Sequence, residues 1–517
     1  MPTLPALSAS RAAAGDAAAA PFFPRRSFIK GILAAGAFPF VAKAATPFSW
    51  GANKGASAPS QKVRIAYIGI GNQGASDIGA LDRTGLTEVV ALCDTEIGHK
   101  RTQGTLKKHP DAARFRDFRE LFDKKGKEFD AVLVATPDFS HFPAAILALS
   151  QGKHVFVEKP VSHTFDQIER LIAAEKKYKT STGGALVTQM GNQGHSSANY
   201  YQFREWTQAG LLDGVTKIVA HMNSARRWHW TIKKNWRHLD AFLPKQDVPA
   251  WLDWEAWLAT AGGHDFNAGY LSGEWRSWFD FGNGALGDWG AHIFDTAHEF
   301  LRLGLPTAVT AVKLEGRNPF VYPQASTLRF QFAARDAADP KKFPAVELLW
   351  YDGQKNIPKL PKTAVAVEED KSIPKSGGGS DKRAAKAPAP GKEIYTAGGA
   401  IFQGASHGSV LKVIESGKTG ISKNAADLPQ YRKDKPDAHY KGFLTAIITG
   451  GKTTSPFHVS GPLCQTMALG VIAQRVAKEG ETLAFDPVAK RITNNDAANA
   501  LLTHVPPRAG WEQFYKM

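Results

Sequence analysis

The segment from Gly284 to His292 offers the clearest acid–base chemistry in the sequence. It contains Asp288 and His292 four residues apart, so a helix there places both side chains on one face. An imidazole beside a carboxylate can take a proton from a hydroxyl group, while the carboxylate orients and supports the ring. A satisfied buried histidine is the alternative for His292, and the patterns described next favour the acid–base role.

Metal binding by the same region is a further alternative. His292, Asp295 and His298 follow one another at intervals of three residues along the predicted helix. This spacing turns the three side chains away from one point, whereas a metal ion needs ligands that converge. The sequence therefore predicts no metal site.

A glycine-rich turn follows a predicted buried strand over residues 63–68 and leads into a predicted helix over 75–83. The turn has the G-x-G-x-x-G pattern and consists of Gly69, Ile70, Gly71, Asn72, Gln73 and Gly74. Its glycines let backbone N–H groups approach a pyrophosphate, which the helix dipole also attracts. The next predicted strand ends at Asp94, whose carboxylate can accept hydrogen bonds from a ribose diol and repels a 2′-phosphate. NAD is therefore expected in preference to NADP.

Strands and helices continue to alternate after this unit. Predicted strands over 131–135 and 154–157 are separated by a predicted helix over 143–150. Such alternation predicts an α/β fold with a doubly wound parallel sheet, whose ligands bind beyond the C-terminal ends of the strands. Five residues near these ends are expected to converge on one crevice: Gly69, Asp94, Thr136, His141 and Lys159.

The glycine turn, Asp94 and two later motifs resemble the Gfo/Idh/MocA family, which includes glucose–fructose oxidoreductase and inositol dehydrogenase. The later motifs are the turn Ala135–Pro137 with His141, and Glu158-Lys159-Pro160. The resemblance extends from about residue 62 to the C-terminus, and Thr136 departs from it because many members have asparagine there. Beyond the glycine turn and Asp94, it implies these cofactor-binding residues: Thr136, Pro137, His141, Glu158, Lys159 and Pro160.

The resemblance also assigns the acid–base group. Asp288 and His292 match the family's Asp-x-x-x-His, which forms a catalytic triad with the lysine of Glu-Lys-Pro. That lysine lies by the nicotinamide and the reacting hydroxyl, so the resemblance implies that Lys159, Asp288 and His292 are catalytic. It implies an NAD-dependent oxidoreductase that acts on a carbohydrate or polyol.

A second domain is expected after the NAD-binding Rossmann domain, which we place at residues 62–185. Strand-like runs occur at 215–221, 308–314, 327–332 and 346–350 without regular helices between them. They predict an α+β domain over 186–517 with a large, mostly antiparallel open sheet. By resemblance, this sheet mediates homo-oligomerisation.

Candidate substrate residues lie early in this second domain. Ten of the 13 tryptophans lie between Trp206 and Trp289, interleaved with arginine and histidine, which suits either a sugar ring or an aromatic packing layer. Trp251, Trp254 and Trp257 are three apart and are expected in a core or interface. The segment 190–195 resembles a loop near the crevice in exported family members. The residues selected are Asn192, His195, Trp228, Tyr270 and Arg276.

The N-terminus has the features of a twin-arginine signal peptide over residues 1–44, followed by a linker over 45–61. Arg25 and Arg26 precede a short apolar run over 31–41, and Ala42-Lys43-Ala44 fits a cleavage site after Ala44. A basic disordered tail is the alternative. The signal predicts export of the folded protein to the periplasm by the twin-arginine machinery, and no apolar run is long enough to form a transmembrane segment.

The net charge of +16 raises the question of nucleic-acid binding. About half of it lies in residues 1–44 and 353–393, and no basic face with interleaved aromatics appears, so no nucleic-acid partner is expected. Residues 353–393 are rich in Lys, Pro, Ala, Gly and Ser and are expected to form a solvated, disordered insertion. Cys93 and Cys464 cannot form a disulfide framework and are expected in the core.

Export constrains the reaction, because an exported enzyme finds no usable NAD pool. The NAD is therefore expected to stay tightly bound and to be regenerated in each cycle. Oxidation of one sugar with reduction of another meets this requirement. A redox-neutral glycosidase, which oxidises a glycoside, eliminates the aglycone, adds water and reduces the ketone again, also meets it. A non-catalytic sugar-binding protein is the third alternative.

Overall fold

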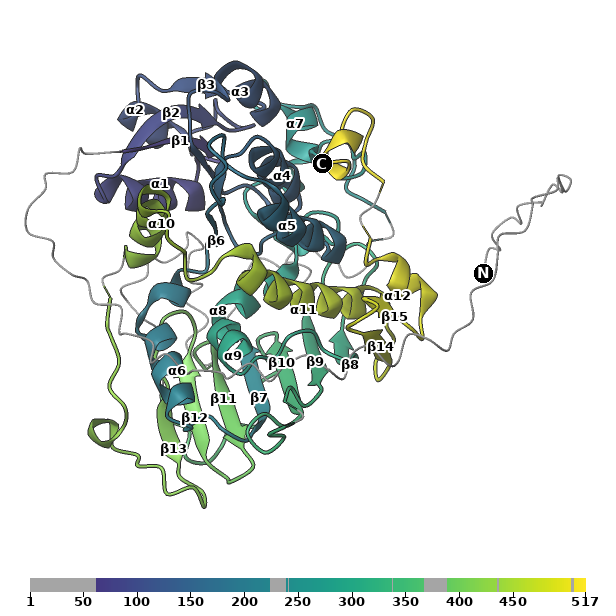
Figure 1. Ribbon diagram of the computed structural model, residues 1–517. Helices are drawn as coiled ribbons and strands as arrows, with labels where there is room; N and C mark the ends of the chain where they lie inside the picture. The colour runs from purple at the N-terminus through teal and green to yellow at the C-terminus, as the bar shows by residue number, and fades with distance from the viewer. Residues whose placement is uncertain are drawn as a thin grey trace, which may run out of the picture. The chain divides into compact units, whose positions relative to one another are not determined.

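Six parallel strands form the first sheet of the computed structural model, in the order β3-β2-β1-β4-β5-β6 (Figure 1). The structure describes residues 62–223, 239, 241–336, 338–366, 388–434, 437–503 and 506–517. The strands are β1 Val63–Ile68, β2 Thr87–Cys93, β3 Ala113–Phe115, β4 Ala131–Val134, β5 His154–Val157 and β6 Thr188–Met190. The predicted doubly wound parallel sheet is confirmed, and β6 extends it beyond the predicted domain end at residue 185.

Helices connect these strands. They are α1 Gln73–Arg83, α2 Gln103–Lys108, α3 Phe118–Lys125, α4 His141–Ser150 and α5 Phe165–Lys177. Helix α5 begins with the capping box that the sequence predicts, because Thr164 accepts a hydrogen bond from the Gln167 backbone and Gln167 reaches back to the Thr164 backbone. The strand–turn–helix order around the glycine turn is as expected from its sequence.

A nine-stranded sheet forms the second half, in the order β13-β12-β11-β7-β10-β9-β8-β14-β15. Its strands are β7 Val215–Met222, β8 Ala308–Glu315, β9 Ala325–Phe332, β10 Val346–Asp352, β11 Gly391–Thr396, β12 Ile401–Ala405, β13 Lys412–Glu415, β14 Thr482–Asp486 and β15 Arg491–Ile492. Only β7 and β10 pair in parallel among these strands, so the predicted mostly antiparallel sheet is confirmed.

The helices of the second half are α6 Ala198–Gln208, α7 Trp254–Leu258, α8 Ala291–Ile293, α9 Asp295–Phe300, α10 Ala438–Thr449, α11 Phe457–Val476 and α12 Asp496–Ala500. They differ in their positions: α11 lies between the two sheets, whereas α7 and α10 lie beside the first sheet (Figure 1). The longest, α11, packs against α5 on one side and β8 on the other. No helix among the residues described is both long and apolar enough to cross a bilayer.

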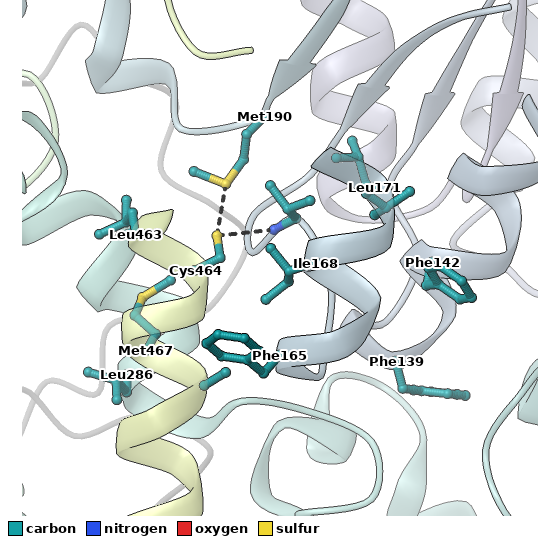
Figure 2. Close-up of a cluster of buried hydrophobic side chains, with 14 of the residues drawn as sticks. Phe139, Phe142, Phe165, Ile168, Leu171, Met190, Leu286, Leu463, Cys464 and Met467 are labelled. Carbon is teal, nitrogen blue, oxygen red and sulfur yellow. Dashed lines mark hydrogen bonds between the residues drawn. The ribbon is translucent and has the colours of Figure 1, made fainter. Parts of the chain in front are cut away.

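A buried apolar cluster joins α11 to the first sheet (Figure 2). At its centre the Cys464 thiol contacts the Met190 sulfur at 3.5 Å and accepts a hydrogen bond from the Val161 backbone at 3.4 Å. Burial raises the pKa of Cys464 to about 12, and Cys93 is likewise fully buried at the end of β2. Both thiols are core residues, as the sequence predicts.

The expected solvated insertion over 353–393 is wrong at its C-terminal end. Strand β11 begins at Gly391 and pairs with β7 and β12, in the interior of the sheet. Lys392 and Glu393 are 0% and 1% exposed, because their side chains leave opposite faces of the strand and find polar partners there. The composition of residues 353–393 predicted a solvated segment. Lys392 and Glu393 are charged residue types, so the sequence has no apolar pattern there that would indicate a buried strand.

Candidate active site

The two halves of the chain form one cleft at the C-terminal ends of the first sheet's strands. Gly69, Asp94, Thr136 and Lys159 all line it, as the sequence predicts. The second half contributes lining residues from a segment that the strand pattern did not identify: Ala256, Trp257, Ser272, Gly273, Trp275, Arg276 and Asp288. This segment is anchored beside the strand ends, where the Asp253 backbone N–H donates to Thr95 at 2.9 Å.

The glycine turn has the close packing that a dinucleotide requires. Gly69 has φ +85°, and a Cβ on it would lie 2.4 Å from the Ala135 carbonyl oxygen. A Cβ on Gly74 would lie 2.1 Å from the Gly69 carbonyl oxygen. Helix α1 starts directly after Asn72, and the first N–H groups of a helix have no partner within it. The turn therefore fits a pyrophosphate held by backbone N–H groups.

Asp94 holds the turn as well as facing the cleft. Its Oδ2 accepts a hydrogen bond from the Ile70 backbone N–H at 2.9 Å, and its Oδ1 accepts one from the Glu96 backbone N–H at 2.8 Å. Burial raises the pKa of Asp94, and these backbone donors oppose that shift. Each carboxylate oxygen has a further lone pair, so both can still accept from a ribose diol.

An ion pair that the sequence did not indicate lies at the same end of the cleft. Arg101 pairs with Glu96, and both line the cleft with Asp94. Burial raises the pKa of Glu96 to about 6. The Arg101 guanidinium is thus neutralised by a carboxylate beside the expected ribose site, which suits an unphosphorylated ribose.

Lys159 and Asp288 meet at the other end of the cleft. The Lys159 ammonium donates to the Asp288 Oδ1 at 2.5 Å and to its backbone oxygen at 2.9 Å. Arg276 donates to the same Oδ1 at 3.3 Å and lies over the Trp275 ring. One carboxylate therefore joins two cations, one from each half of the chain.

A single π-helical turn, Leu286–Gly290, sets the position of Asp288. Leu286 is fully buried and packs beside α11 (Figure 2). A Cβ on Gly287 would lie 2.2 Å from Asn283 and one on Gly290 2.9 Å from Phe294, so the turn requires residues without side chains there. The predicted helical segment is confirmed, with a wider first turn before α8.

His292 is oriented by a histidine that the sequence analysis missed. The His292 ring stacks on His407, with centroids 3.9 Å apart and planes at 19°. The His407 backbone N–H donates to the His292 carbonyl at 2.9 Å. Burial, and then the charges of His407 and Lys159, hold the pKa of His292 well below its usual value. A neutral imidazole can accept a proton, which is the role expected of it.

The expectation that Asp288 supports the His292 ring stays a prediction, and the charge of Asp288 does raise the pKa of that ring against the larger effect of burial. The Asp288 Oδ1 is engaged by Lys159 and Arg276, whereas His292 contacts His407 from the loop after β12. The spacing of four residues between Asp288 and His292 indicates neither the contacts of Asp288 with the two cations nor the stack of His292 on His407. The loop that carries His407 is more than 100 residues away, so only the fold brings the two rings together.

Asp138 is a further cleft residue without a sequence signal. Its Oδ2 accepts a hydrogen bond from the Asn283 backbone at 3.0 Å. Burial raises the pKa of Asp138 to about 7, although Arg276 opposes the shift. Together with Glu158, it adds acidic groups to the lining that also contains Lys159 and Pro137.

Eight of the selected residues that the structure describes lie outside the lining of the cleft: Ile70, Gly74, His141, Pro160, Asn192, His195, Tyr270 and His292. The His141 ring lies between the carbonyls of Pro160 and Thr136, and each carbonyl oxygen is 2.8 Å from a ring nitrogen. The ring therefore holds the two turns that contain these residues. His195 is paired with Asp295 at 2.8 Å and Glu299 at 2.6 Å. Tyr270 is fully buried, and its hydroxyl accepts a hydrogen bond from the Leu243 backbone, which supports the packing interpretation.

The charge of His195 follows from its two carboxylate partners. Burial lowers its pKa, but Asp295 and Glu299 outweigh burial and raise the pKa of His195 to about 10. Asn192 is fully buried, and of the selected substrate residues Arg276 is the one that lines the cleft. Trp228, the predicted signal peptide over 1–44 and the predicted linker over 45–61 lie outside the described residues.

The metal alternative finds no support in these contacts. Asp295 binds His195, the His298 Nε2 lies 2.9 Å from the Gly304 carbonyl, and His292 stacks on His407. The three side chains are therefore held in different directions. Within the described ranges, no group of three or more His, Cys, Asp or Glu residues could hold a metal ion.

The fold and the cleft define a dinucleotide-binding oxidoreductase fold with a second α/β domain. Residues 63–183 match the family model "Oxidoreductase family, NAD-binding Rossmann fold", and residues 198–315 match "Oxidoreductase family, C-terminal alpha/beta domain". These two segments belong to the Gfo/Idh/MocA oxidoreductase family, and the resemblance noted in the sequence is confirmed.

Curated relatives are similar over part of their length. An inositol 2-dehydrogenase of Salmonella paratyphi B is 24% identical over 206 residues, which cover 36% of this chain and 59% of that protein. An α-N-acetylgalactosaminidase of Shewanella oneidensis is 27% identical over 205 residues, 35% of this chain and 42% of that protein. The match therefore spans less than two thirds of either relative.

Solved structures share the fold. The WlbA dehydrogenase of Bordetella pertussis, determined with NADH and UDP-GlcNAcA, aligns with a TM-score of 0.51 at 14% identity. The alignment covers 82% of this chain and 99% of that one. The two-domain architecture is thus common to both proteins.

Proposed function

We propose that this protein is an NAD-dependent oxidoreductase that oxidises a hydroxyl group of a carbohydrate or polyol. The observation that carries the proposal is the contact between the Lys159 ammonium and the Asp288 carboxylate at 2.5 Å, in the cleft that also holds the glycine turn. Membership of the Gfo/Idh/MocA family and similarity to an inositol 2-dehydrogenase support the same reaction class.

The residues of the site have complementary roles in this reaction. Bound NAD supplies a hydride acceptor. Lys159, placed by Asp288, donates a hydrogen bond to the substrate oxygen and stabilises the negative charge that develops there. His292, which burial keeps neutral, accepts the hydroxyl proton. Asp288 and Arg276 hold the lysine in position, and the glycine turn holds the pyrophosphate.

A redox-neutral glycosidase is the second candidate. It is favoured by the similarity to an α-N-acetylgalactosaminidase, over a segment as long as that shared with the dehydrogenase. Its first step is the same oxidation, which acidifies the neighbouring C–H and permits elimination of the aglycone. A non-catalytic sugar-binding protein is disfavoured, because such a protein has no need of Lys159, Asp288 and His292 in one region.

Export and assembly belong to this proposal. The twin-arginine pattern at Arg25 and Arg26 supports transport of the folded protein to the periplasm with NAD already bound. The open nine-stranded sheet offers a surface for homo-oligomerisation, as the family resemblance implies. Tight retention of NAD is consistent with a cleft that Trp257 and Trp275 of the second half also line.

Mass spectrometry of the purified protein with a panel of glycosides and polyols, without added NAD, tests the proposal. A new keto-sugar supports the oxidoreductase, and release of the aglycone supports the glycosidase. If the protein leaves every compound unchanged while still binding sugars, the binding-protein alternative replaces both. A Lys159→Ala variant is the control, because it should retain the sugar and lose the conversion.

A further inference from the structure

Two buried carboxyl groups lie directly behind the cleft. Asp77, on α1, is 0% exposed, and Glu158, which immediately precedes Lys159, is 5% exposed. They come from different elements of the first sheet's layer, and the Asp77 carboxyl hydrogen-bonds the Glu158 carboxyl. Neither the glycine pattern nor the Glu-Lys-Pro motif indicates that these two residues meet.

The other hydrogen bonds of the two carboxyl groups show that one of the two must carry a proton. The Asp77 Oδ1 accepts from the Tyr440 hydroxyl at 2.7 Å and from Gln73 at 2.8 Å. The Glu158 Oε1 accepts from Gln193 at 3.0 Å, and its Oε2 accepts from the Lys159 backbone at 3.2 Å. The Asp77 Oδ2 is buried without a donor. Two carboxylates only accept, so a hydrogen bond between them requires a proton on one.

Electrostatics favours the same state. Burial raises the pKa of Asp77 to about 7. Burial, and then the charge of Asp77, raise the pKa of Glu158 well above its usual range. The charged or titratable groups that face the pair are Lys159 and Tyr440, and one ammonium cannot compensate two buried carboxylates in contact.

We propose that Asp77 and Glu158 form a carboxyl pair that holds one shared proton and positions the turn that carries Lys159. The shared proton joins helix α1, which holds the glycine turn, to the Glu158-Lys159-Pro160 turn. Tyr440 and Gln193, which hydrogen-bond each other at 3.0 Å, complete the network from α10 and the loop after β6. Asp77 is a positioning residue, since it acts through Glu158 and lies outside the lining of the cleft.

The pair also gives the cleft a charge that changes with pH. Glu158 lines the cleft beside Lys159, so loss of the shared proton places a second negative charge there. An oxidised nicotinamide is cationic and a reduced one is neutral, so higher pH favours the oxidised dinucleotide. The inference rests on the proposed function only in requiring that a nicotinamide dinucleotide binds.

Infrared spectroscopy tests the shared proton without any substrate. At pH 7, the wild-type protein should show the C=O stretch of a protonated carboxyl, which shifts in deuterium oxide. In Asp77→Asn the amide donates to Glu158 in place of the proton, so the part of the band that belongs to the pair should be lost while the fold is kept, and the part from Asp138, whose pKa burial raises to about 7, should remain. Asp352→Asn, which removes a buried carboxyl bonded to Ser326 in the second sheet, should retain the band. A band unchanged in Asp77→Asn overturns the proposal.

A second variant, Tyr440→Phe, tests the shared proton independently if Asp77→Asn does not fold. Tyr440→Phe keeps the aromatic stack on Phe156 and removes only the hydroxyl that donates to Asp77. It should shift the band and raise the pH at which the pair loses its proton. If neither the frequency nor that pH changes, Asp77 is not the group that carries the proton.

Competition between NAD⁺ and NADH tests the consequence for the cofactor. The bound ratio of NAD⁺ to NADH, measured by chromatography after equilibration at pH 6 and pH 9, should rise with pH, by at most about tenfold per pH unit. In Asp77→Asn the bound ratio of NAD⁺ to NADH should be the same at pH 6 and pH 9. A flat wild-type ratio overturns the proposal and leaves the proposed function intact, whereas failure to bind either nucleotide contradicts the proposed function and leaves the infrared test in force.

Discussion

The Lys159 ammonium lies 2.5 Å from the Asp288 carboxylate although the two residues are 129 positions apart in the sequence. Lys159 follows the fifth strand of the parallel sheet, and Asp288 lies in the π-helical turn of the second half. The contact therefore forms only when both halves are folded and docked. A site built in this way is complete only in the folded protein, as the proposed export of the folded chain requires.

NAD is expected to copurify with the protein, because the glycine turn and Asp94 fit a dinucleotide and the second half also lines the cleft. Heat denaturation followed by chromatography should release close to one equivalent of NAD per chain. The matched variant Gly74→Ala should contain much less, since its Cβ would lie 2.1 Å from the Gly69 carbonyl. Wild-type protein that releases no nucleotide contradicts the prediction.

Asp94→Arg is expected to shift the preference toward NADP or to abolish binding. The substitution removes the acceptor for the ribose diol and adds a cation that favours a phosphate. It also removes the acceptor of the Ile70 backbone N–H, so loss of all binding is the more severe of the two results. Asp94→Asn keeps an acceptor oxygen and separates these effects. Titration calorimetry with both dinucleotides measures the outcome, and unchanged NAD affinity in Asp94→Arg excludes the assigned role.

The sequence predicted the parallel sheet, the glycine turn and four of the strand-end residues that meet in the cleft; the fifth predicted residue, His141, lies outside the lining. These features have local signals, because a strand, a turn and a helix follow one another within about 20 residues. The positions of His407 and Asp77 had no such signal. Their partners, His292 and Glu158, are brought to them by sheet and helix packing across long stretches of chain, which single-sequence patterns do not encode.

Charged residues that are buried in the fold were the second reason why sequence-based predictions were wrong. Lys392, Glu393 and the ion pairs of His195 are polar residues that the fold places in its interior. A sequence-based reading assigns polar residues to solvent or to a site, because burial without a partner is unfavourable. Here partners from other elements satisfy them, so His195 is held by Asp295 and Glu299 in a buried ion-pair cluster, away from the cleft lining.

Lys159→Ala and His292→Ala should each lose the hydride step and retain the cofactor. General acid–base groups contribute roughly a hundred- to ten-thousand-fold in rate, whereas pyrophosphate binding depends on the backbone of residues 69–74. Single-turnover absorbance of the bound nicotinamide after mixing with substrate isolates this step from product release. Losses under about tenfold would assign the proton transfer to another residue. Wild-type rates in both variants would refute the catalytic assignment.

His439 provides a test of how buried histidines set the acid stability of the fold. Its Nε2 lies 2.8 Å from the Met190 carbonyl and its Nδ1 lies 2.8 Å from the Ser196 hydroxyl, so one N–H and one lone pair satisfy the neutral ring. Burial lowers the pKa of His439 to about 3. In the unfolded chain the pKa is about 6.5, so protons bind preferentially to the unfolded state between these values.

The stabilisation from His439 is therefore fully present above pH about 6.5 and is lost as the pH falls toward about 3. At pH 5, protonation of the unfolded chain removes about 2 kcal/mol of it. The loss of unfolding free energy in His439→Gln should consequently be about 2 kcal/mol smaller at pH 5 than at pH 8. Urea denaturation at the two pH values measures the difference. Ser196→Ala removes the same hydrogen bond without a titrating group, so its effect should be equal at both pH values. Equal effects of His439→Gln at pH 5 and pH 8 would show that the histidine is charged in the folded state, contrary to its hydrogen-bond partners.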